Sequence, residues 1–277
     1  MPVSSSLRCS SHLVLFILIS VGASALTAEE LTQAAGKAYA EYFERARQAF
    51  QDRVNQPLGT DSERTRLRKE EVIVRPGGGD GIVTNPKSLV HHWRGAIFIR
   101  GVTLDQVLSV SRAYRDYPKI FGPVVAARVV ADQGDLLRVQ FRMRQSAAGM
   151  SATLDVWSSI RYTRVSATQA DEISISDEIR EVKDPGQPTE RSLPPGRDSG
   201  YLWRAAAFTR FVEADGGVYM EMETIGLSRP FPPLFGWLIE PIARRIGRGS
   251  VENSVQEFRR AVLMRYPTAM PHGSGAD

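Results

Sequence analysis

The segment from Gly200 to Arg229 constrains the fold more than any other part of the chain. It reads GYLWRAAAFTRFVEADGGVYMEMETIGLSR, two alternating runs separated by Asp215-Gly216. An Asp-Gly pair between such runs is the strongest short signal for a β-hairpin, because both central residues of a type I′ turn need a positive φ. The segment therefore predicts two long paired strands, with Arg210 opposite Glu221.

The two faces of this predicted hairpin differ in chemistry, since successive side chains of a strand point to opposite sides. One face carries Arg204, Arg210, Tyr219, Glu221 and Glu223. The other carries Trp203, Ala205, Ala207, Phe211, Met220 and Met222. This second face is apolar but alternates large and very small side chains. Such a surface either lines a hollow or lies under a helix.

The N-terminus has the pattern of a secretory signal peptide. A basic start without acids precedes an apolar run from Leu13 to Ala23, and small residues follow up to Ala25. We expect cleavage after Ala25, because the run is about half the roughly 20 residues of a membrane-spanning helix. The only cysteine, Cys9, leaves with this leader, so the mature chain cannot form a disulfide. The expected location is secreted, in a bacterial periplasm.

Charge patterning excludes a nucleic-acid partner. The formal net charge is +4, and the basic residues are scattered, with acids close by as between Arg64 and Glu71. Nucleic-acid binding would require a concentrated basic patch. The apolar segment 230–237 beside Arg244, Arg245 and Arg248 leaves a transient membrane-surface contact as a minority interpretation.

The remaining pattern predicts an α+β fold. Its expected elements are a helix at 27–52 capped by Thr27, a mobile linker or surface helix to Lys69, a strand at 88–100, a helix from Thr103 to about Tyr114, a hairpin about Gln133-Gly134, strands at 150–165 and 173–182, a short apolar helix ending at 247–249, and a final helix from Ser250. An antiparallel sheet buries one face, so the C-terminal helix must cover it.

Several short motifs, in this order, resemble the START-like superfamily, also called SRPBCC, helix-grip or Bet v 1-like. They are Trp93-Arg94-Gly95, Tyr117-Pro118 to Pro123-Val124, 200–204, 216–221 and 227–229. The likeness covers about residues 88–266 and is strongest to an uncharacterised bacterial START-like group. It implies a curved antiparallel sheet gripping a long C-terminal helix, with a pocket that relatives use for lipids, sterols, quinones or polyketides. It implies no catalytic residue.

With this resemblance, the chain divides into four parts. We expect a signal peptide at 1–25, an N-terminal helix and linker at 26–69, a START-like domain at 70–266 and a disordered tail at 267–277. The ligand-binding candidates between sheet and helix are Phe141, Met143, Leu154, Val156, Trp203, Ala205, Ala207, Phe211, Met220, Met222 and Phe258.

The polar residues Arg210, Glu221 and Glu223 allow two interpretations. If their face points inward, they form a polar cluster that orients a ligand headgroup or serves acid chemistry. Otherwise they form an exposed cross-strand ion pair worth under about 1 kcal/mol, which the sequence favours.

No catalytic, cofactor or metal site is predicted. His91 and His92 are adjacent on a strand, so they point to opposite faces and cannot comfortably share a metal. There is no Gly-x-Ser-x-Gly motif, and the glycines at 77–79 lack the lysine of a phosphate loop and indicate a turn.

The sequence thus favours a secreted START-like protein that binds a hydrophobic small molecule or lipid. Two further functions stay open. One is a cyclase or isomerase-type enzyme, which needs a pocket carboxylate with a shifted pKa. The second is a cell-envelope interaction protein with a filled core, whose N-terminal helix is the contact arm.

Overall fold

The computed structural model describes residues 31–267 except 86, 148–149, 195–197 and 231–235. The predicted signal peptide and nearly all of the predicted tail lie outside these residues. The elements are α1 (Gln33–Asp52), α2 (Asp61–Arg68), β1 (Ile73–Pro76), β2 (Ile82–Asn85), β3 (Ser88–Arg100), α3 (Leu104–Ser111), η1 (Tyr114–Asp116), α4 (Tyr117–Ile120), β4 (Val124–Asp132), β5 (Leu136–Ala147), β6 (Met150–Ser166), β7 (Gln169–Lys183), β8 (Arg191–Ser192), β9 (Arg204–Ala214), β10 (Gly217–Ser228) and α5 (Gly236–Arg265).

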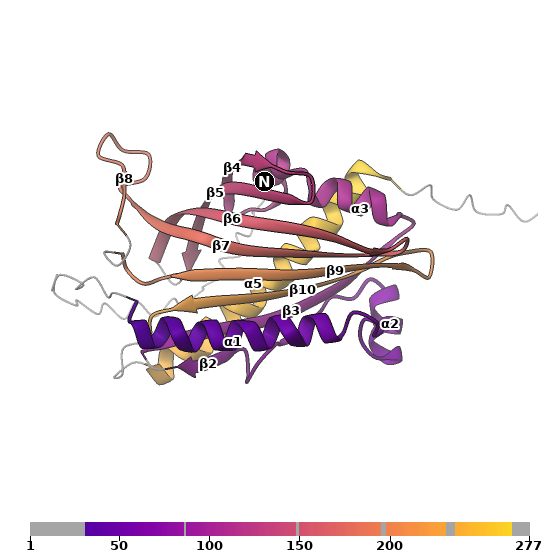
Figure 1. Cartoon of the computed structure of the whole chain (residues 1–277), viewed down its shortest axis with the longest axis horizontal. Coiled ribbons are helices and arrows are strands. Elements are labelled where there is room, and N and C mark those ends of the chain that lie inside the picture. The colour runs from indigo at the N-terminus through magenta and orange to yellow at the C-terminus, as the bar shows by residue number, and fades with distance from the viewer. Residues whose placement is uncertain (1–30, 86, 148–149, 195–197, 231–235, 268–277) are drawn as a thin grey trace, which may run out of the picture.

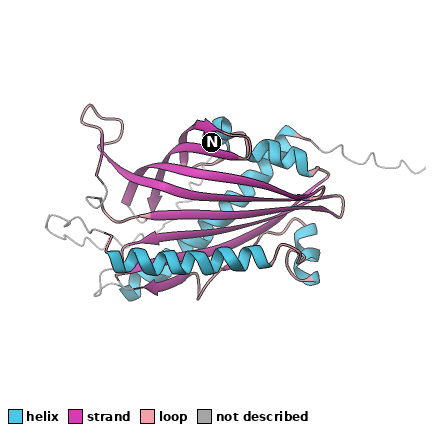
Figure 2. Ribbon diagram, viewed as in Figure 1, coloured by secondary structure: helices cyan, strands magenta, loops and turns pink. Residues whose placement is uncertain are grey.

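One large antiparallel sheet organises the molecule and confirms the predicted α+β class. Its strand order is β1-β3-β10-β9-β7-β6-β5-β4, with β2 also paired to β3 and β8 to β7. Helix α1 runs along one face of the sheet and α5 crosses the other (Figure 1; Figure 2). We call these the outer face and the inner face.

The β9–β10 hairpin confirms the register predicted from Asp215-Gly216. Arg210 pairs with Glu221, and Phe211 with Met220. Both turn residues have positive φ, 54° at Asp215 and 74° at Gly216, as a type I′ turn requires. Local turn chemistry therefore sets which side chains of these two central strands share a face.

The N-terminal helix is confirmed over the described residues. Thr32, rather than Thr27, is the N-cap, and its side chain accepts a hydrogen bond from the Ala35 amide. The stretch after α1 contains a true helix, α2, which begins with a capping box formed by Thr60 and Glu63. Of the two expectations for this stretch, the surface helix was therefore the right one.

The C-terminal helix corrects one expectation. The glycines at 247–249 were expected to end a short helix, but α5 continues through them and through Pro241 without a break. A Cβ on Gly247 would lie 2.7 Å from the Trp93 indole nitrogen, so glycine lets the helix pass over this ring. The close helix–sheet contact outweighs the roughly 1 kcal/mol that a helical glycine costs relative to alanine.

Gly95 brings α5 onto β3. A Cβ at Gly95 would lie 2.5 Å from the nearer methyl carbon of Val251, closer than packed carbons come. The helix is therefore seated on β3, near one edge of the sheet, and the strands from β7 to β4 extend beyond it.

Candidate functional site

The inner face of the sheet carries two apolar clusters, and the partly buried Leu108 and Phe121 pack against both. The first joins α3 and the C-terminal half of α5 to β3, β9 and β10, and includes Phe211, Met220 and Phe258. The second joins η1 to β5, β6 and β7, and includes Tyr114 and Phe141. Between the two clusters lies a strip of the sheet whose residues are not among the buried members of either cluster.

We call this strip the inner strip. It consists of half-buried residues on β7, β9 and β10: Glu172, Ser174, Ala205, Ala207, Met222 and Thr224. Each of these strands has a paired neighbour on both sides, so their side chains reach solvent only through a face of the sheet. The strip is therefore partly accessible on the inner face, although Ala205 packs against the second cluster and Met222 against the first.

The N-terminal half of α5 supports this interpretation. Within the described part of α5, no residue from Glu240 to Ser250 is fully buried. Buried residues begin at Val251 and continue with Val255, Phe258 and Val262. The fully buried residues of the described helix therefore lie in its C-terminal half, although Gly247 also packs closely on Trp93.

The predicted ligand-binding residues divide into three groups. Phe141, Leu154, Val156, Phe211, Met220 and Phe258 are fully buried in the two clusters and pack as core. Met143, Ala205, Ala207 and Met222 are half-buried on the inner face, the last three in the inner strip. The accessible part of the predicted site is therefore lined by small and flexible side chains.

Trp203 is the exception and corrects the predicted face. It packs in a third apolar cluster, on the outer face, with Tyr39 and Phe50 of α1 and with Phe208. Trp203 precedes the first residue of β9, so the alternation of that strand does not extend to it. Trp203 is therefore an outer-face residue and does not line the inner strip.

Arg210 also differs from the expectation. Its guanidinium is 2% exposed and lies beneath α1, on the outer face. It makes two hydrogen bonds of 2.8 Å to Asp171 and one of 3.2 Å to the Phe50 carbonyl oxygen, and it stacks over the Phe50 ring at 4.4 Å. The expected exposed pair with Glu221 was wrong, because a helix distant in sequence covers this face.

Glu221 and Glu223 belong to a buried polar network under α1. Glu223 accepts a hydrogen bond of 2.6 Å from Arg53 and bonds His92 at 2.6 Å, and His92 bonds Tyr42 at 2.7 Å. Arg75 donates to Glu221 at 2.8 Å. These acids therefore face away from the inner strip and cannot orient a ligand there.

The pKa of Glu223 reflects its partners. Burial pushes this pKa upward, but the hydrogen bond and charge of His92, together with the charges of Arg53 and Arg94, outweigh it. The net result is a lowered pKa, so Glu223 is ionised at neutral pH. This network attaches α1 to the sheet through charged groups as well as apolar contacts.

Glu172, on the inner strip, is a residue that sequence reasoning missed. The Ser111 hydroxyl of α3 donates to its carboxyl group at 2.6 Å. The row continues from Ser111 to the Tyr162 hydroxyl at 2.9 Å and from Tyr162 to the Tyr114 hydroxyl at 2.6 Å. The alternation in β7 places Glu172 on the same face as Ala170, but no signal in the sequence brings α3 and η1 to it.

Burial raises the pKa of Glu172, although the hydrogen bonds of Ser111 and Tyr162 and the charge of Arg112 act against the shift. Glu172 is half-buried on the inner face of the sheet. The raised pKa means that this carboxyl group binds a proton more readily than an exposed glutamate does.

His91 and His92 point to opposite faces, as predicted. His92 bonds Glu223 on the outer face, and His91 bonds the Ser228 hydroxyl at 2.8 Å. Among the described residues, no group of three histidine, cysteine or acidic side chains is placed to hold a metal ion. No helix in the described part of the chain is long and apolar enough to cross a membrane.

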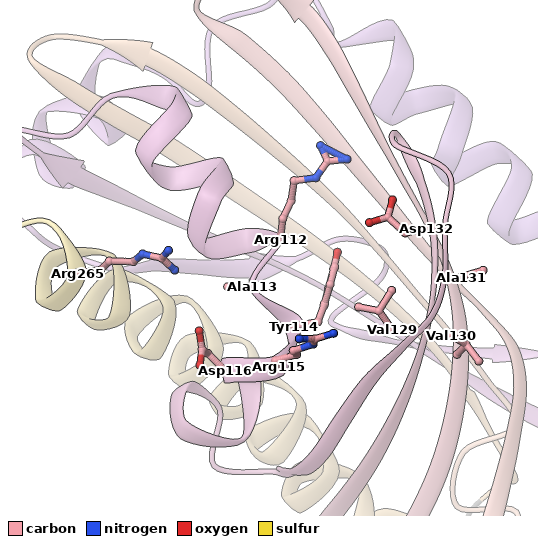
Figure 3. A pocket seen from close by; sticks show the side chains of 10 residues that line it. All are labelled: Arg112, Ala113, Tyr114, Arg115, Asp116, Val129, Val130, Ala131, Asp132 and Arg265. Carbon is pink, nitrogen blue, oxygen red and sulfur yellow. The ribbon is translucent and has the colours of Figure 1, made fainter.

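A groove of about 530 Å³ opens to solvent beside the second cluster, between η1, β4 and the C-terminal end of α5. Figure 3 shows Arg265 of α5 on one side and Val129 and Val130 of β4 on the other. The full lining is Arg112, Ala113, Tyr114, Arg115, Asp116, Val129, Val130, Ala131, Asp132 and Arg265. Tyr114 is buried at the base of this groove and bonds the Tyr162 hydroxyl.

Comparisons with known proteins complete the description. Neither a family model nor a curated protein matches the chain. A STAR-related lipid transfer protein from Xanthomonas axonopodis has a TM-score of 0.45 and 15% identity, over 66% of this chain and 99% of its own. Human STARD10 has a TM-score of 0.44 and 12% identity, over 76% and 82%. An aromatase/cyclase from Streptomyces has a TM-score of 0.37 and 14% identity, over 64% and 93%.

These solved structures are similar to the chain only at low identity and at TM-scores below 0.5, so they assign it no superfamily, role or ligand.

Proposed function

We propose that this protein binds a hydrophobic small molecule or a lipid noncovalently, between the inner strip and the N-terminal half of α5. The observation that carries the proposal is the partial exposure of Ala205, Ala207 and Met222 on strands that have neighbours on both sides. A ligand here would be held mainly by burial of apolar surface, worth about 25 cal/mol per Å².

Two adjacent alanines of β9 provide a matched test. Ala207 is half-buried on the inner strip, and Ala206 is buried on the outer face. In Ala207→Leu, the larger side chain enters the proposed binding space, so the protein should keep its stability and bind an apolar dye such as N-phenylnaphthylamine several-fold more weakly. Ala206→Leu overfills a packed layer and should lose about 1–3 kcal/mol of stability while its folded form still binds the dye.

The measurements are dye fluorescence and urea unfolding. Failure of the wild-type protein to bind any apolar dye, together with equal destabilisation of both variants, would show a filled interior. Mass spectrometry of lipids that copurify from the native host identifies the class of ligand.

A second candidate function is a cyclase or isomerase-type enzyme, which requires a carboxyl group of shifted pKa in the binding space. Glu172 satisfies this requirement in position and in the direction of its pKa. If copurified ligands are chemically converted by the wild-type protein and not by Glu172→Gln, which still binds them, catalysis is the function. Conversion that persists in the variant excludes Glu172 as the catalytic group.

An envelope-interaction role has less support. Helix α1 packs along the outer face with buried Tyr39, Ala46 and Phe50, so it is not a free contact arm. The apolar segment at 230–237 falls mostly outside the described residues, and its contact with a membrane surface stays a prediction.

We further propose export to the periplasm, supported by the leader pattern up to Ala25. The intact mass of the periplasmic protein should correspond to a chain that begins at Leu26. A cytoplasmic protein that retains its leader would contradict this.

A further inference from the structure

We propose that Glu172 and the hydroxyl groups beside it hold the polar end of the ligand, and that this end is an uncharged hydroxyl or carbonyl group. The inference rests on the proposed binding function and specifies which hydrophobic molecules the site accepts. Four observations lead to it.

The first observation is position. Glu172 lies on β7 opposite Thr209 of β9, and two residues further along, Ser174 lies opposite Ala207. The carboxyl group is therefore next to the small side chains of the inner strip. A molecule whose apolar body covers Ala207 reaches Glu172 with one end.

The second observation is the hydroxyl row. Ser111 donates to the Glu172 carboxyl group, and the Tyr162 hydroxyl bonds both Ser111 and Tyr114, with either hydroxyl of each pair able to donate. Tyr117 is engaged elsewhere, because its hydroxyl donates to the Ser111 carbonyl oxygen at 2.6 Å. The three hydroxyl groups thus satisfy one another and hold the carboxyl group in place.

The third observation is spare hydrogen-bonding capacity. A carboxyl group offers about four lone-pair sites, and its protonated form also donates one hydrogen bond. Ser111 and Tyr162 each hydrogen-bond Glu172, so two of these sites are used. A ligand hydroxyl can donate to the remaining oxygen sites, and a ligand carbonyl can accept from the protonated form, so both neutral groups fit.

The fourth observation is charge. Arg112 is the arginine whose charge acts on Glu172, but its guanidinium stacks over the Tyr162 ring at 4.3 Å and donates to the Gly134 carbonyl oxygen. It also lies 3.6 Å from Asp135. Among the described residues, Arg112 is the cation whose charge acts on Glu172, and these contacts already engage it, so a carboxylate or phosphate beside Glu172 would gain little compensating charge. The site therefore discriminates against anionic headgroups.

The test compares lauryl alcohol with laurate as competitors of bound N-phenylnaphthylamine. The alcohol should displace the dye from the wild-type protein at about a tenfold lower concentration than laurate does, at neutral pH. In Glu172→Leu, the affinity for lauryl alcohol should fall about fivefold to tenfold, the effect of one lost hydrogen bond, while dye affinity stays the same. Glu172→Gln, which keeps a donor and an acceptor, should restore most of the affinity for the alcohol.

The matched control is Glu178→Leu. Glu178 lies on the same strand with Arg180 as its partner, where the Arg180 guanidinium also stacks on Trp157. This variant should bind dye and alcohol as the wild-type protein does. Urea unfolding confirms that each variant is folded. Glu172→Leu removes a buried carboxyl group but leaves the Ser111 hydroxyl without its acceptor, so its stability should stay within about 1–3 kcal/mol of the wild-type value.

The outcomes separate the two proposals. The role of Glu172 in holding the polar end of the ligand is here called the anchor. A wild-type protein that does not bind the dye overturns both the proposed function and the anchor. Dye binding combined with unchanged alcohol affinity in Glu172→Leu overturns the anchor and leaves the binding function standing. A preference for laurate over the alcohol also overturns the anchor.

Discussion

Removing the Arg210 guanidinium should be among the most destabilising single changes in the outer layer. In Arg210→Met, a side chain of similar length keeps the contact with α1 but loses both hydrogen bonds to Asp171 and the bond to the Phe50 carbonyl oxygen. Asp171 then stays buried beneath α1 without its partner.

The expected loss follows from burial. Breaking a buried ion pair by removing one partner costs about 3–5 kcal/mol, because the remaining charge is uncompensated. Stacking of Arg210 on Phe50 adds about 1–2 kcal/mol when the cation is desolvated. Since a domain is stable by about 5–15 kcal/mol, Arg210→Met should lose a large fraction of its stability.

The assay is urea unfolding of purified protein, followed by circular dichroism. The double variant Arg210→Met with Asp171→Leu removes both charges and should recover most of the loss, since replacing a buried pair by apolar residues is often neutral. Arg128→Met is the control, because Arg128 lies on the edge strand β4 away from this layer, and it should change stability by less than about 0.5 kcal/mol. If Arg210→Met loses less than about 1 kcal/mol of stability, the buried ion pair is refuted and the exposed ion pair that the sequence favoured is the better interpretation.

Three further changes test other contacts. Gly95→Ala should lose about 1–3 kcal/mol of stability because its Cβ meets Val251, and the added change Val251→Ala should relieve the loss; an unchanged melting temperature would contradict the close approach of α5 to β3. The raised pKa of Glu172 means that its contribution to stability is complete below the ordinary glutamate pKa and is lost as pH rises through the raised value. The stability of the wild-type protein relative to Glu172→Gln should therefore fall from acidic to alkaline buffer in urea unfolding, and a constant difference would contradict it. The lowered pKa of Glu223 has the opposite effect: its contribution to stability is present above the ordinary glutamate pKa and is lost as pH falls through the lowered value. The difference in unfolding free energy between the wild-type protein and Glu223→Gln should therefore shrink in acid, and a difference that stays constant there would refute this.

Local chemistry allowed much of the fold to be predicted. The Asp215-Gly216 turn determined the register of β9 and β10, because only a few residue pairs accept positive φ at both positions. The strand at 88–100 was predicted with its observed bounds, since its β-branched and aromatic content is local information. Thr103 likewise marked the start of α3 through its own side-chain cap.

The candidate site was predicted only in part. Alternation placed Ala205, Ala207 and Met222 on one face correctly, but it could not tell which of their neighbours would pack as core. Phe211 packs against Phe258 because α5 is seated on β3, and that position depends on the contact of Gly95 with Val251, two residues far apart in the chain.

By itself, the sequence determined the strands, their turns and the partition of side chains between two faces, because each depends on residues within a few positions of one another. Only the tertiary structure decided what covers each face. Helix α1 buries Arg210 and Glu223 on one side, and α3 brings Ser111 to Glu172 on the other. A period of two residues assigns a side chain to a face, but burial, charge and pKa depend on the layer that packs against that face, and distant segments supply that layer.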